Sequence, residues 1–381
     1  MSDPSGTEQG ERPATAGGGE GRYPCLDGLR GTSILLVLLS HATSTPDLLR
    51  FSPDDIVEVG NIGVRLFFIL SGFLFTTMLV QERERTGTIS LKAFYMRRTL
   101  RIFPAFYAYI VAIAVASALG WLVLKRYDVL AALTFTMNYH PNRAWELGHL
   151  WSLAVTEQFY LVWPATVLVF GRRGATYSAL AALVIAPLAR VVLFLLFPGF
   201  RVSIGESFET VFDAIAVGAL VALVAMDRSS DSFLDRVLRH PATPLVALVV
   251  SLATHALHPH VRFSFPIGET ITNVGLGLVV GGCLVNPSNP VGRVLQSRFM
   301  AWIGSISFSL YLTQQPFNSP TRNDWATHFP VNVALAIVSA LALHYSVELP
   351  FMRLRSRLTK KLKKAASIPP PLAQSQVAPR S

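Results

Sequence analysis

GVRLFFILSGFL, residues 63–74, decides the fold class, because it lies within an apolar run that is long enough to cross a bilayer. A membrane-spanning helix needs roughly 20 mostly apolar residues. Ten such runs occur in the chain, over 26–45, 61–80, 101–124, 148–170, 175–197, 208–226, 242–257, 266–285, 300–317 and 331–349. The sequence therefore predicts an all-α, polytopic integral membrane helix bundle with about ten transmembrane helices.

The bulk composition agrees with this prediction. Of 381 residues, 51% are hydrophobic and 15% are charged, whereas a soluble domain carries about 25% charged residues. A net charge of +10 in a soluble protein would indicate nucleic-acid binding, but here the excess Lys and Arg lie in short loops and in a C-terminal tail. That placement is typical of a membrane protein, so we expect no nucleic-acid partner. Cys25 and Cys283 are too few for a disulfide framework.

The distribution of positive charge predicts the orientation of the chain. With ten spans and the N-terminus inside, the inner loops and the tail hold 20 Lys and Arg, and the outer loops hold 7. Because positive residues favour the cytoplasmic side, both termini are expected in the cytoplasm. The short apolar stretch 128–139 is not counted as a span, since counting it would put the basic tail outside. The Ala-, Val- and Arg-rich composition is compatible with a bacterial protein. In a bacterium, a chain with this topology is expected in the inner (plasma) membrane.

Three regions are expected along the chain. Residues 1–22 are polar and Gly-rich and are expected to form a disordered cytoplasmic leader, 23–353 form the membrane domain, and 354–381 form a basic and then Pro-rich cytoplasmic tail. The two halves of the membrane region do not mirror each other in hydropathy. This disfavours a transporter built from inverted repeats.

Two ionisable residues belong to the first span. An ionisable group at membrane depth costs roughly 2.5–3.5 kcal/mol on insertion scales, so such groups are functional candidates. On a helix, Arg30 and His41 are about 16 Å apart, which puts Arg30 near the inner surface and His41 toward the outer half. A histidine titrates near neutral pH, which suits His41 to act as a base. The alternatives are that Arg30 snorkels to the inner interface and that His41 is simply interfacial.

Two arginines open the third span, and a carboxylate lies within the fourth. Arg98 and Arg101 are i,i+3 neighbours that face one way on a helix. Two guanidinium groups at the inner membrane surface suit a phosphate or pyrophosphate, and the alternative is a plain topology signal. Glu157 lies near mid-span, where a carboxylate must be neutral, paired or water-exposed. A structural ion pair is the alternative to a functional role for Glu157.

Other ionisable groups have simpler explanations. Arg65 lies near the outer end of its span and is expected to reach outward. Glu348 lies at the inner end of the last span and is expected to pair with Arg353 or Arg355. The loop histidines have loose metal-like spacing but no carboxylate or Cys partner, so no metal site is expected at His255, His258 and His260.

The ordered set of motifs resembles the membrane-bound acyltransferase-3 family of O-acyltransferases and O-acetyltransferases. The motifs are LDGLRG with a following His, GVxxFFxLSGFL, RRxxRIxPxxY, WSLxVxExFYLxxP in looser form, SxxxYLxxxP and the closing YSVELP. They extend from Tyr23 to Arg353, which is nearly the whole membrane region. Each motif alone is common, whereas the complete set in this order is specific.

The resemblance implies the reaction and its participants. Family members move an acyl group, acetyl or another short acyl, from acyl-CoA to a hydroxyl group. The acceptor is a saccharide, a glycolipid or a sugar-bearing secondary metabolite such as a macrolide. Acetyl-CoA is the expected co-substrate, without a permanently bound cofactor, and membrane lipids are the remaining partners.

The resemblance also implies roles for individual residues. Arg30 and His41 match the functional Arg and His of the first span, and Arg98 and Arg101 match the motif that holds the CoA phosphates. In this hypothesis His41 deprotonates the acceptor hydroxyl, which attacks the thioester, while Arg30 and Glu157 orient the polar cleft. His41 and the arginine pair are expected near opposite membrane faces. Either the pantetheine arm bridges them or the acyl group is relayed through a covalent intermediate.

The chain departs from the family pattern at two positions. The family commonly has Glu where this chain has Thr156, and the acid Glu157 lies one residue later, about 100° further around the helix. The family often has His where this chain has Gln314. The alternative function is that of a secondary transporter or flippase of a related amphipathic substrate, with the same intramembrane charges along its path.

Overall fold

The computed structural model describes residues 24–43, 53–226 and 233–366. Within these ranges every regular element is a helix, which confirms the all-α prediction. The expected leader, 1–22, lies outside the described residues, and so does the tail from 367 onward. The long helices are α1 (Pro24–Thr43), α2 (Pro53–Thr86), α3 (Leu91–Ala118), α6 (Leu150–Leu196), α7 (Phe208–Ala225), α9 (Thr243–Ala256), α11 (Glu269–Val285), α13 (Arg298–Thr313), α14 (Val331–Leu343) and α15 (Leu349–Ala366).

Short elements connect the long helices. They are α4 (Asp128–Leu133), η1 (Met137–Tyr139), α5 (Trp145–Gly148), η2 (Pro198–Ser203), α8 (Phe233–Arg239), α10 (Val261–Phe263), η3 (Ser264–Gly268), α12 (Pro290–Leu295), η4 (Gln315–Phe317) and η5 (His344–Glu348). The stretch 128–139 contains only α4 and η1, which are too short to cross a bilayer.

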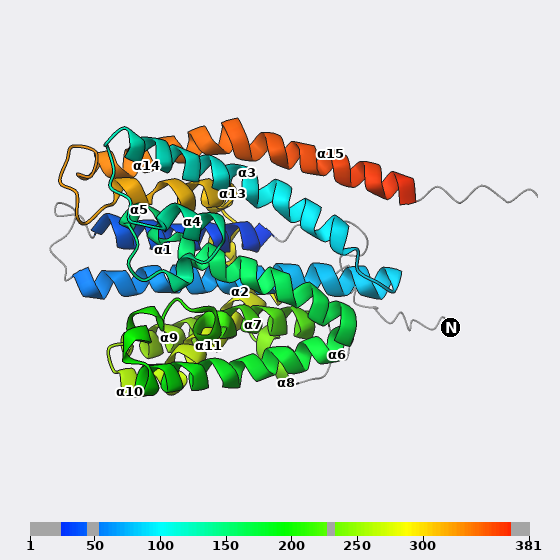
Figure 1. Cartoon of the computed structure of the whole chain (residues 1–381). Helices are drawn as coiled ribbons and strands as arrows, with labels where there is room; N and C mark the ends of the chain where they lie inside the picture. Colours follow the sequence, from blue (N-terminus) through cyan, green and yellow to red (C-terminus); the bar gives the residue numbers. More distant parts are fainter. Residues whose placement is uncertain (1–23, 44–52, 227–232, 367–381) are drawn as a thin grey trace, which may run out of the picture.

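Helix α2 lies in the middle of the bundle (Figure 1). On one side of it are α1, α3, α13, α14 and α15, and on the other are α7, α9, α11 and the second half of α6, whose first half crosses α2 in this view. The start of α1 and the end of α15 lie at the same end of the bundle (Figure 1). We call this end the basic end, because Arg83, Arg97 and Lys360 belong to it, and we call the opposite end the distal end.

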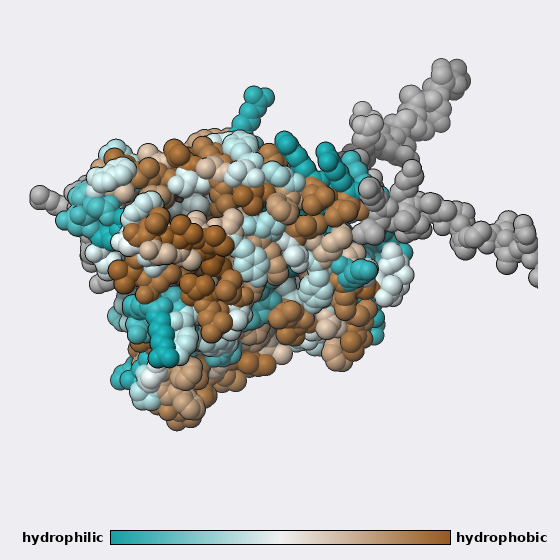
Figure 2. All heavy atoms as spheres, turned by 45° about the horizontal axis from the view of Figure 1, so that its top comes forward, coloured by the Kyte–Doolittle hydropathy of each residue, from teal (hydrophilic) through white to brown (hydrophobic). Residues whose placement is uncertain are grey.

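Apolar side chains cover much of the surface (Figure 2). Hydrophilic side chains gather toward the two ends of the face that Figure 2 shows. On the second half of α6, Val184, Leu188 and Leu195 are 58–63% exposed. A soluble protein rarely exposes large contiguous apolar surfaces. The outer surface therefore fits a lipid environment.

Glycines let α2 and α7 approach each other closely. A Cβ atom built on Gly72 of α2 would lie 1.9 Å from the carbonyl oxygen of Ile215, and one on Gly218 of α7 would lie 1.9 Å from that of Ile69. Any larger residue at either position would push the helices apart. Small residues serve this purpose in membrane bundles.

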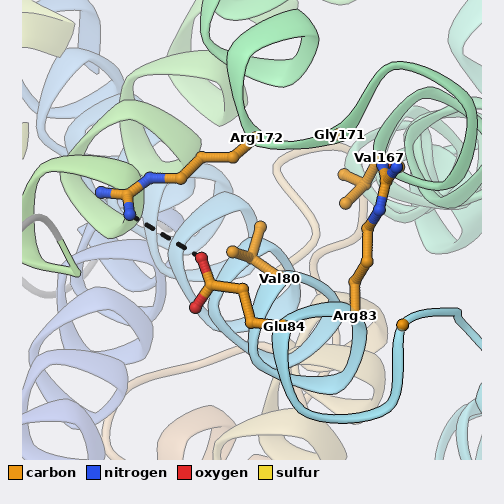
Figure 3. Close-up of a pocket in the computed structure, with 7 residues that line it drawn as sticks. Val80, Arg83, Glu84, Val167, Gly171 and Arg172 are labelled. Atoms are coloured by element: carbon orange, nitrogen blue, oxygen red, sulfur yellow. Dashed lines mark hydrogen bonds and ion pairs between the residues drawn. The ribbon is translucent and has the colours of Figure 1, made fainter.

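Helix α6 bends sharply at Gly171 and returns along the bundle (Figure 1). Gly171 has φ 65° and ψ −164°, a combination that is essentially restricted to glycine. Arg83 reaches from α2 to the bend, where its guanidinium donates to the carbonyl oxygen of Val167 (Figure 3). Beside it, Arg172 and Glu84 form an ion pair of 3.7 Å in a pocket of about 330 Å³. Two expected spans, 148–170 and 175–197, are thus the arms of one bent helix.

The expected count of about ten spans is not confirmed. Among the described residues, six helices are long and apolar enough to cross a membrane, and the bent pair of α8 and α9 would make seven. Helix α13 has only 16 residues, α1 carries Asp27, Arg30 and His41, and the two arms of α6 count once. The six are Val59–Thr86, Leu91–Ala118, Trp145–Leu196, Pro198–Ala225, Val261–Val285 and Val331–Lys360.

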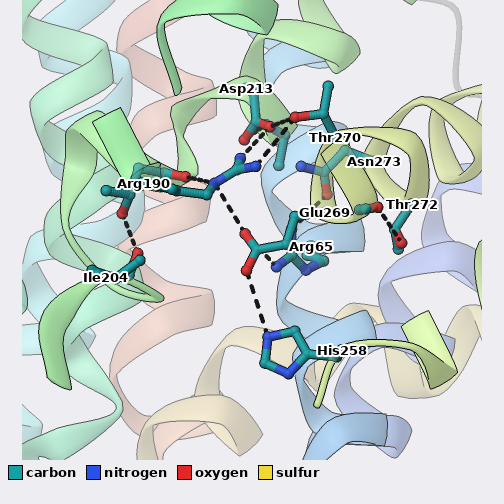
Figure 4. A network of polar contacts seen from close by, with 12 residues as sticks. Arg65, Arg190, Ile204, Asp213, His258, Glu269, Thr270, Thr272 and Asn273 are labelled. Carbon is teal, nitrogen blue, oxygen red and sulfur yellow. Dashed lines mark hydrogen bonds and ion pairs between the residues drawn. The ribbon is translucent and has the colours of Figure 1, made fainter. Parts of the chain in front are cut away.

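A buried charge network joins α2, α6, α7 and α11 (Figure 4). Arg190 is fully buried and pairs with Asp213, and its Nε lies 3.1 Å from Glu269. Arg65 lies 3.1 Å from the same Glu269 carboxylate and donates to the side-chain oxygen of Asn273 at 2.9 Å. The prediction that Arg65 reaches outward is therefore wrong. Its charge is buried, and such charges persist only when they are paired.

Candidate active site

A cavity of about 890 Å³ lies between α1, α2, α3, α6, α13 and α15. Its mouth is at the basic end, where the exposed Ser356 and Lys360 of α15 line it. Ser152 of α6 and Tyr311 of α13 line it deeper in the bundle. Between these regions the walls are mostly apolar, and their residues include Phe67, Phe68, Leu70, Leu74, Phe75 and Met78.

Cationic side chains concentrate at the mouth of this cavity. Arg30, Arg98 and Arg101, which the sequence singled out, all line it. Three further cations that the sequence did not single out line it as well, namely Arg97, Arg355 and Lys360. The arginines of the first and third spans therefore converge on one cavity.

Arg98 and Arg101 differ in their surroundings. Nε of Arg98 lies 3.0 Å from Oε2 of Glu157, and its guanidinium lies 3.2 Å from the ring centroid of Tyr160. Glu157 and Tyr160 are i,i+3 neighbours on α6, so both face Arg98 on α3. Arg101 forms no ion pair or hydrogen bond with any residue that the structure describes. Glu157 does not line the cavity and forms the structural ion pair that the sequence left open.

Two other cations near the mouth, Arg30 and Arg97, have their own carboxylate partners. Arg30 pairs with Asp27 at 3.2 Å, three residues earlier on α1. Arg97 pairs with Glu82 of α2, also at 3.2 Å. Both arginines line the cavity while their charge is largely balanced.

The expected pairing of Glu348 with a tail arginine is wrong. Glu348 accepts a hydrogen bond from the hydroxyl of Ser309 at 2.6 Å and lies 2.9 Å from Nδ1 of His344. Helix α15 continues beyond residue 353 to Ala366. The first part of the expected tail is therefore helical and reaches the mouth of the cavity through Arg355 and Lys360.

Tyr311 marks the deep end of the cavity. Its hydroxyl donates to the backbone carbonyl of His149 and lies 2.8 Å from Oγ of Ser152. The rings of Tyr311 and His149 meet edge to face, with centroids 5.0 Å apart. Tyr311 thus separates the cavity from a second polar group beyond it.

His41 belongs to this second group, in the last turn of α1 at the distal end (Figure 1). Its Nδ1 lies 3.0 Å from Oε1 of Gln314, and its ring meets Trp145 edge to face at 5.4 Å. His41 does not line the cavity that holds the arginines. The indole N–H of Trp145 donates to the carbonyl oxygen of Gln315 at 2.9 Å. The structure therefore separates His41 from the arginines, as the helix geometry predicted.

Three buried polar atoms near His41 have no hydrogen-bond partner among the described residues. They are Nδ1 of His149, Nε2 of Gln314 and Oε1 of Gln315. Nε2 of His149 faces the carbonyl oxygen of Leu312 at 3.2 Å, so Nδ1 keeps its lone pair. Buried polar groups are nearly always hydrogen-bonded, and exceptions call for an explanation. The group around His41 thus offers two acceptors and one donor to an incoming hydroxyl.

Sequence reasoning missed Tyr311, Ser152 and His149 as parts of the site. Tyr311 was visible as the tyrosine of SxxxYLxxxP, and Ser152 as the serine of the WSL block. His149 is 5% exposed and packs on Tyr311.

Comparisons with known proteins identify the family. Residues 23–348 match the acyltransferase-3 family model, which is described as an acyltransferase domain. The chain is 28% identical to the peptidoglycan O-acetyltransferase OatA of Listeria monocytogenes over 88% of this chain and 56% of that protein. It is also 28% identical to the putative peptidoglycan O-acetyltransferase YrhL of Bacillus subtilis, over 86% of this chain and 55% of that protein.

A putative O-acetyltransferase of Staphylococcus aureus is 24% identical over 87% of this chain and 58% of that protein. The chain spans a little over half the length of these curated relatives. No solved structure matches it. Because the family model covers most of the chain and the helices carry the apolar surfaces of a membrane protein, this chain belongs to the acyltransferase-3 family of membrane proteins.

Proposed function

We propose that this chain transfers an acyl group, most simply acetyl, from acyl-CoA to a hydroxyl group of a saccharide. One observation carries the proposal. A cavity with a cationic mouth leads to Tyr311, and His149 and then His41 lie beyond it. This arrangement suits a reaction in which an anionic donor and a hydroxyl acceptor meet from opposite ends. The names of the relatives support a saccharide acceptor.

The cavity suits acyl-CoA in its charge and in its walls. The phosphates of CoA bind at the mouth, where guanidinium groups form strong charge-assisted hydrogen bonds with phosphate oxygens. The pantetheine arm then lies along the apolar walls, and the thioester reaches Ser152 and Tyr311. The hydroxyl of Tyr311 already donates to the carbonyl of His149, so the hydroxyl of Ser152 is the one that can turn to donate to the oxyanion that forms when the thioester is attacked.

His41 acts as the general base on the distal side. The side-chain carbonyl of Gln314 can only accept a hydrogen bond, so Nδ1 of His41 carries the proton and Nε2 keeps a lone pair. Nε2 takes the proton of the acceptor hydroxyl as its oxygen bonds to the acyl carbon. The carbon–sulfur bond breaks, and the proton passes to the thiolate of CoA. Such general-base assistance contributes roughly 10²- to 10⁴-fold.

The orientation of the chain decides which side each reactant uses. We assign the basic end to the cytoplasm, because the positively charged residues gather there. Both termini are then cytoplasmic, and the protein lies in the bacterial plasma membrane. The acceptor approaches His41 from the distal side. A cell-surface saccharide, a glycolipid or a sugar-bearing metabolite such as a macrolide meets this requirement.

The test is acetyl transfer by the purified protein in proteoliposomes. Acetyl-CoA with a labelled acetyl group is added together with an N-acetylglucosamine oligosaccharide, and both thiol release and labelled sugar are measured. The proposal predicts that both products form and that His41→Gln abolishes both. A transporter or flippase would move the saccharide across the membrane without releasing any thiol, and that result would overturn the proposal.

A further inference from the structure

We infer that α15 supplies half of the binding site for the donor's phosphates, through Arg355 and Lys360 acting together with Arg101 of α3. The inference rests on the proposed function, since it concerns the same donor cavity. Arg355 and Lys360 lie beyond the residues that match the family model, which end at 348. They also lie outside the arginine motif of the third span.

The first argument is the balance of charge at the mouth. Asp27 pairs with Arg30, Glu82 pairs with Arg97, and Glu157 pairs with Arg98. Among the described residues, by contrast, Arg101 and Lys360 have no ion pair or hydrogen bond. An arginine that is already paired and stacked must give up its partner before it can bind a phosphate. The cations that are ready to bind an anion are therefore Arg101 and Lys360, on two different helices.

The second argument is the face that α15 turns toward the cavity. Arg355, Ser356, Thr359 and Lys360 all line it. Arg355 and Thr359 are four residues apart, as are Ser356 and Lys360, and residues four apart lie on the same face of a helix. Arg357 lies between them in sequence, is exposed and does not line the cavity. Helix α15 runs alongside α3 (Figure 1). The two helices thus present cations to the mouth from separate elements.

The third argument is the chemistry of the donor. CoA carries a 3′-phosphate and a 5′-diphosphate on its nucleotide, so its phosphates are spread over a wide area. A single arginine motif on one helix turn reaches only part of that area. Arginine binds a phosphate bidentately, whereas lysine acts as a point charge. Arg101 and Arg355 therefore suit defined contacts, and Lys360, which is exposed at the rim, suits the outermost phosphate.

The experiment measures CoA binding to the full-length protein by isothermal titration calorimetry in detergent. The variants are Arg355→Gln, Lys360→Gln and the double variant, with Arg357→Gln as the matched control on the same helix. We expect the Kd for CoA to rise about tenfold for each single variant, which corresponds to about 1.4 kcal/mol. Arg357→Gln should leave the Kd unchanged. Lys360→Arg keeps the charge and should bind CoA like the wild type.

Salt dependence provides a second readout. Ionic strength screens exposed charges, so raising the salt concentration should weaken CoA binding to the wild type more than to the double variant. A double variant with the wild-type Kd, or an equal loss in Arg357→Gln, would overturn the inference. Thermal unfolding of each variant separates a lost contact from a misfolded protein. If the variants change CoA binding as expected but the wild-type protein transfers no acetyl group, the phosphate site is supported and the proposed reaction is contradicted.

Discussion

The side-chain carbonyl of Gln314 lies 3.0 Å from Nδ1 of His41, so an amide from α13 holds the imidazole at the end of α1. The amide oxygen accepts the Nδ1 proton and thereby selects the tautomer whose Nε2 is basic. In the proposed reaction His41 is the base, and the amide of Gln314 is its positioning residue.

Replacing Gln314 should slow turnover without affecting donor binding. In Gln314→Leu, His41 loses the acceptor that fixes its tautomer and its ring orientation. We expect kcat to fall at least about tenfold, since an orienting partner of an essential histidine typically contributes 10- to 100-fold. The KM for acetyl-CoA should stay unchanged, because the arginines lie at the other end. Gln296→Leu, far from His41, is the control. A normal kcat in Gln314→Leu would show that the contact is only structural.

Arg98 and Arg101 should behave differently when each is changed to Gln. Arg98→Gln leaves Glu157 as an unpaired charge at a largely buried position, which typically costs about 3–5 kcal/mol. Arg101→Gln should keep the wild-type stability, because Arg101, unlike Arg98, forms no ion pair with a described residue. It should raise the KM for acetyl-CoA about tenfold, because Arg101 is available to bind the donor. Thermal unfolding and acetyl-CoA kinetics measure the two effects.

The double variant Arg98→Gln/Glu157→Gln is the matched control for this comparison. It removes both charges together and should recover most of the stability that Arg98→Gln loses. Equal stability of Arg98→Gln and Arg101→Gln would contradict the assignment of Arg98 to a structural ion pair.

Gly171→Ala should destabilise the bend of α6. The backbone angles of Gly171 cost a residue with a Cβ atom about 1–3 kcal/mol, and the new Cβ would lie 2.9 Å from the guanidinium of Arg83. We expect a lower thermal midpoint. Gly199→Ala is the control, because a Cβ atom there meets nothing within 4 Å. If both variants unfold at the wild-type temperature, the bend does not depend on glycine.

Reporter fusions test the orientation of the bent helix. One fusion after Arg143 and one after Arg173 place the reporter before the first arm of α6 and just beyond its bend. We expect the first reporter outside and the second inside the cell. The same side for both would mean that the first arm does not cross the membrane. That result would also remove the assignment of the basic end to the cytoplasm.

Hydropathy was sufficient to predict the helical class, whereas the count of about ten spans is not confirmed. The apolar runs 148–170 and 175–197 correspond to the two helical arms on either side of Gly171, but the sharp bend between them involves Arg83 from another helix. A window average cannot detect such a contact. Helix α1 corresponds to the expected span 26–45, and it is part of the bundle core although Asp27, Arg30 and His41 lower its hydropathy.

Helical periodicity in the sequence predicted which neighbouring residues of the site share a helix face, but not their partners on other helices. The i,i+3 spacing of Arg98 and Arg101 correctly put both on the cavity wall. The partner of Arg98, however, is 59 residues away, and the partner of His41 is 273 residues away. Such pairings depend on how the helices pack. Lys360 was assigned to a tail because charge alone indicated topology, whereas the helical face that lines the cavity became visible only in the bundle.

The central claim is that His41 is the base in acetyl transfer to a hydroxyl. The direct measurement compares wild type and His41→Gln in proteoliposomes, with labelled acetyl-CoA and an N-acetylglucosamine oligosaccharide as acceptor. Glutamine can form a hydrogen bond but cannot take a proton at neutral pH, so the account predicts a fall in kcat of about 100-fold or more with normal membrane insertion. Near-wild-type transfer of acetyl to the sugar by His41→Gln would contradict it.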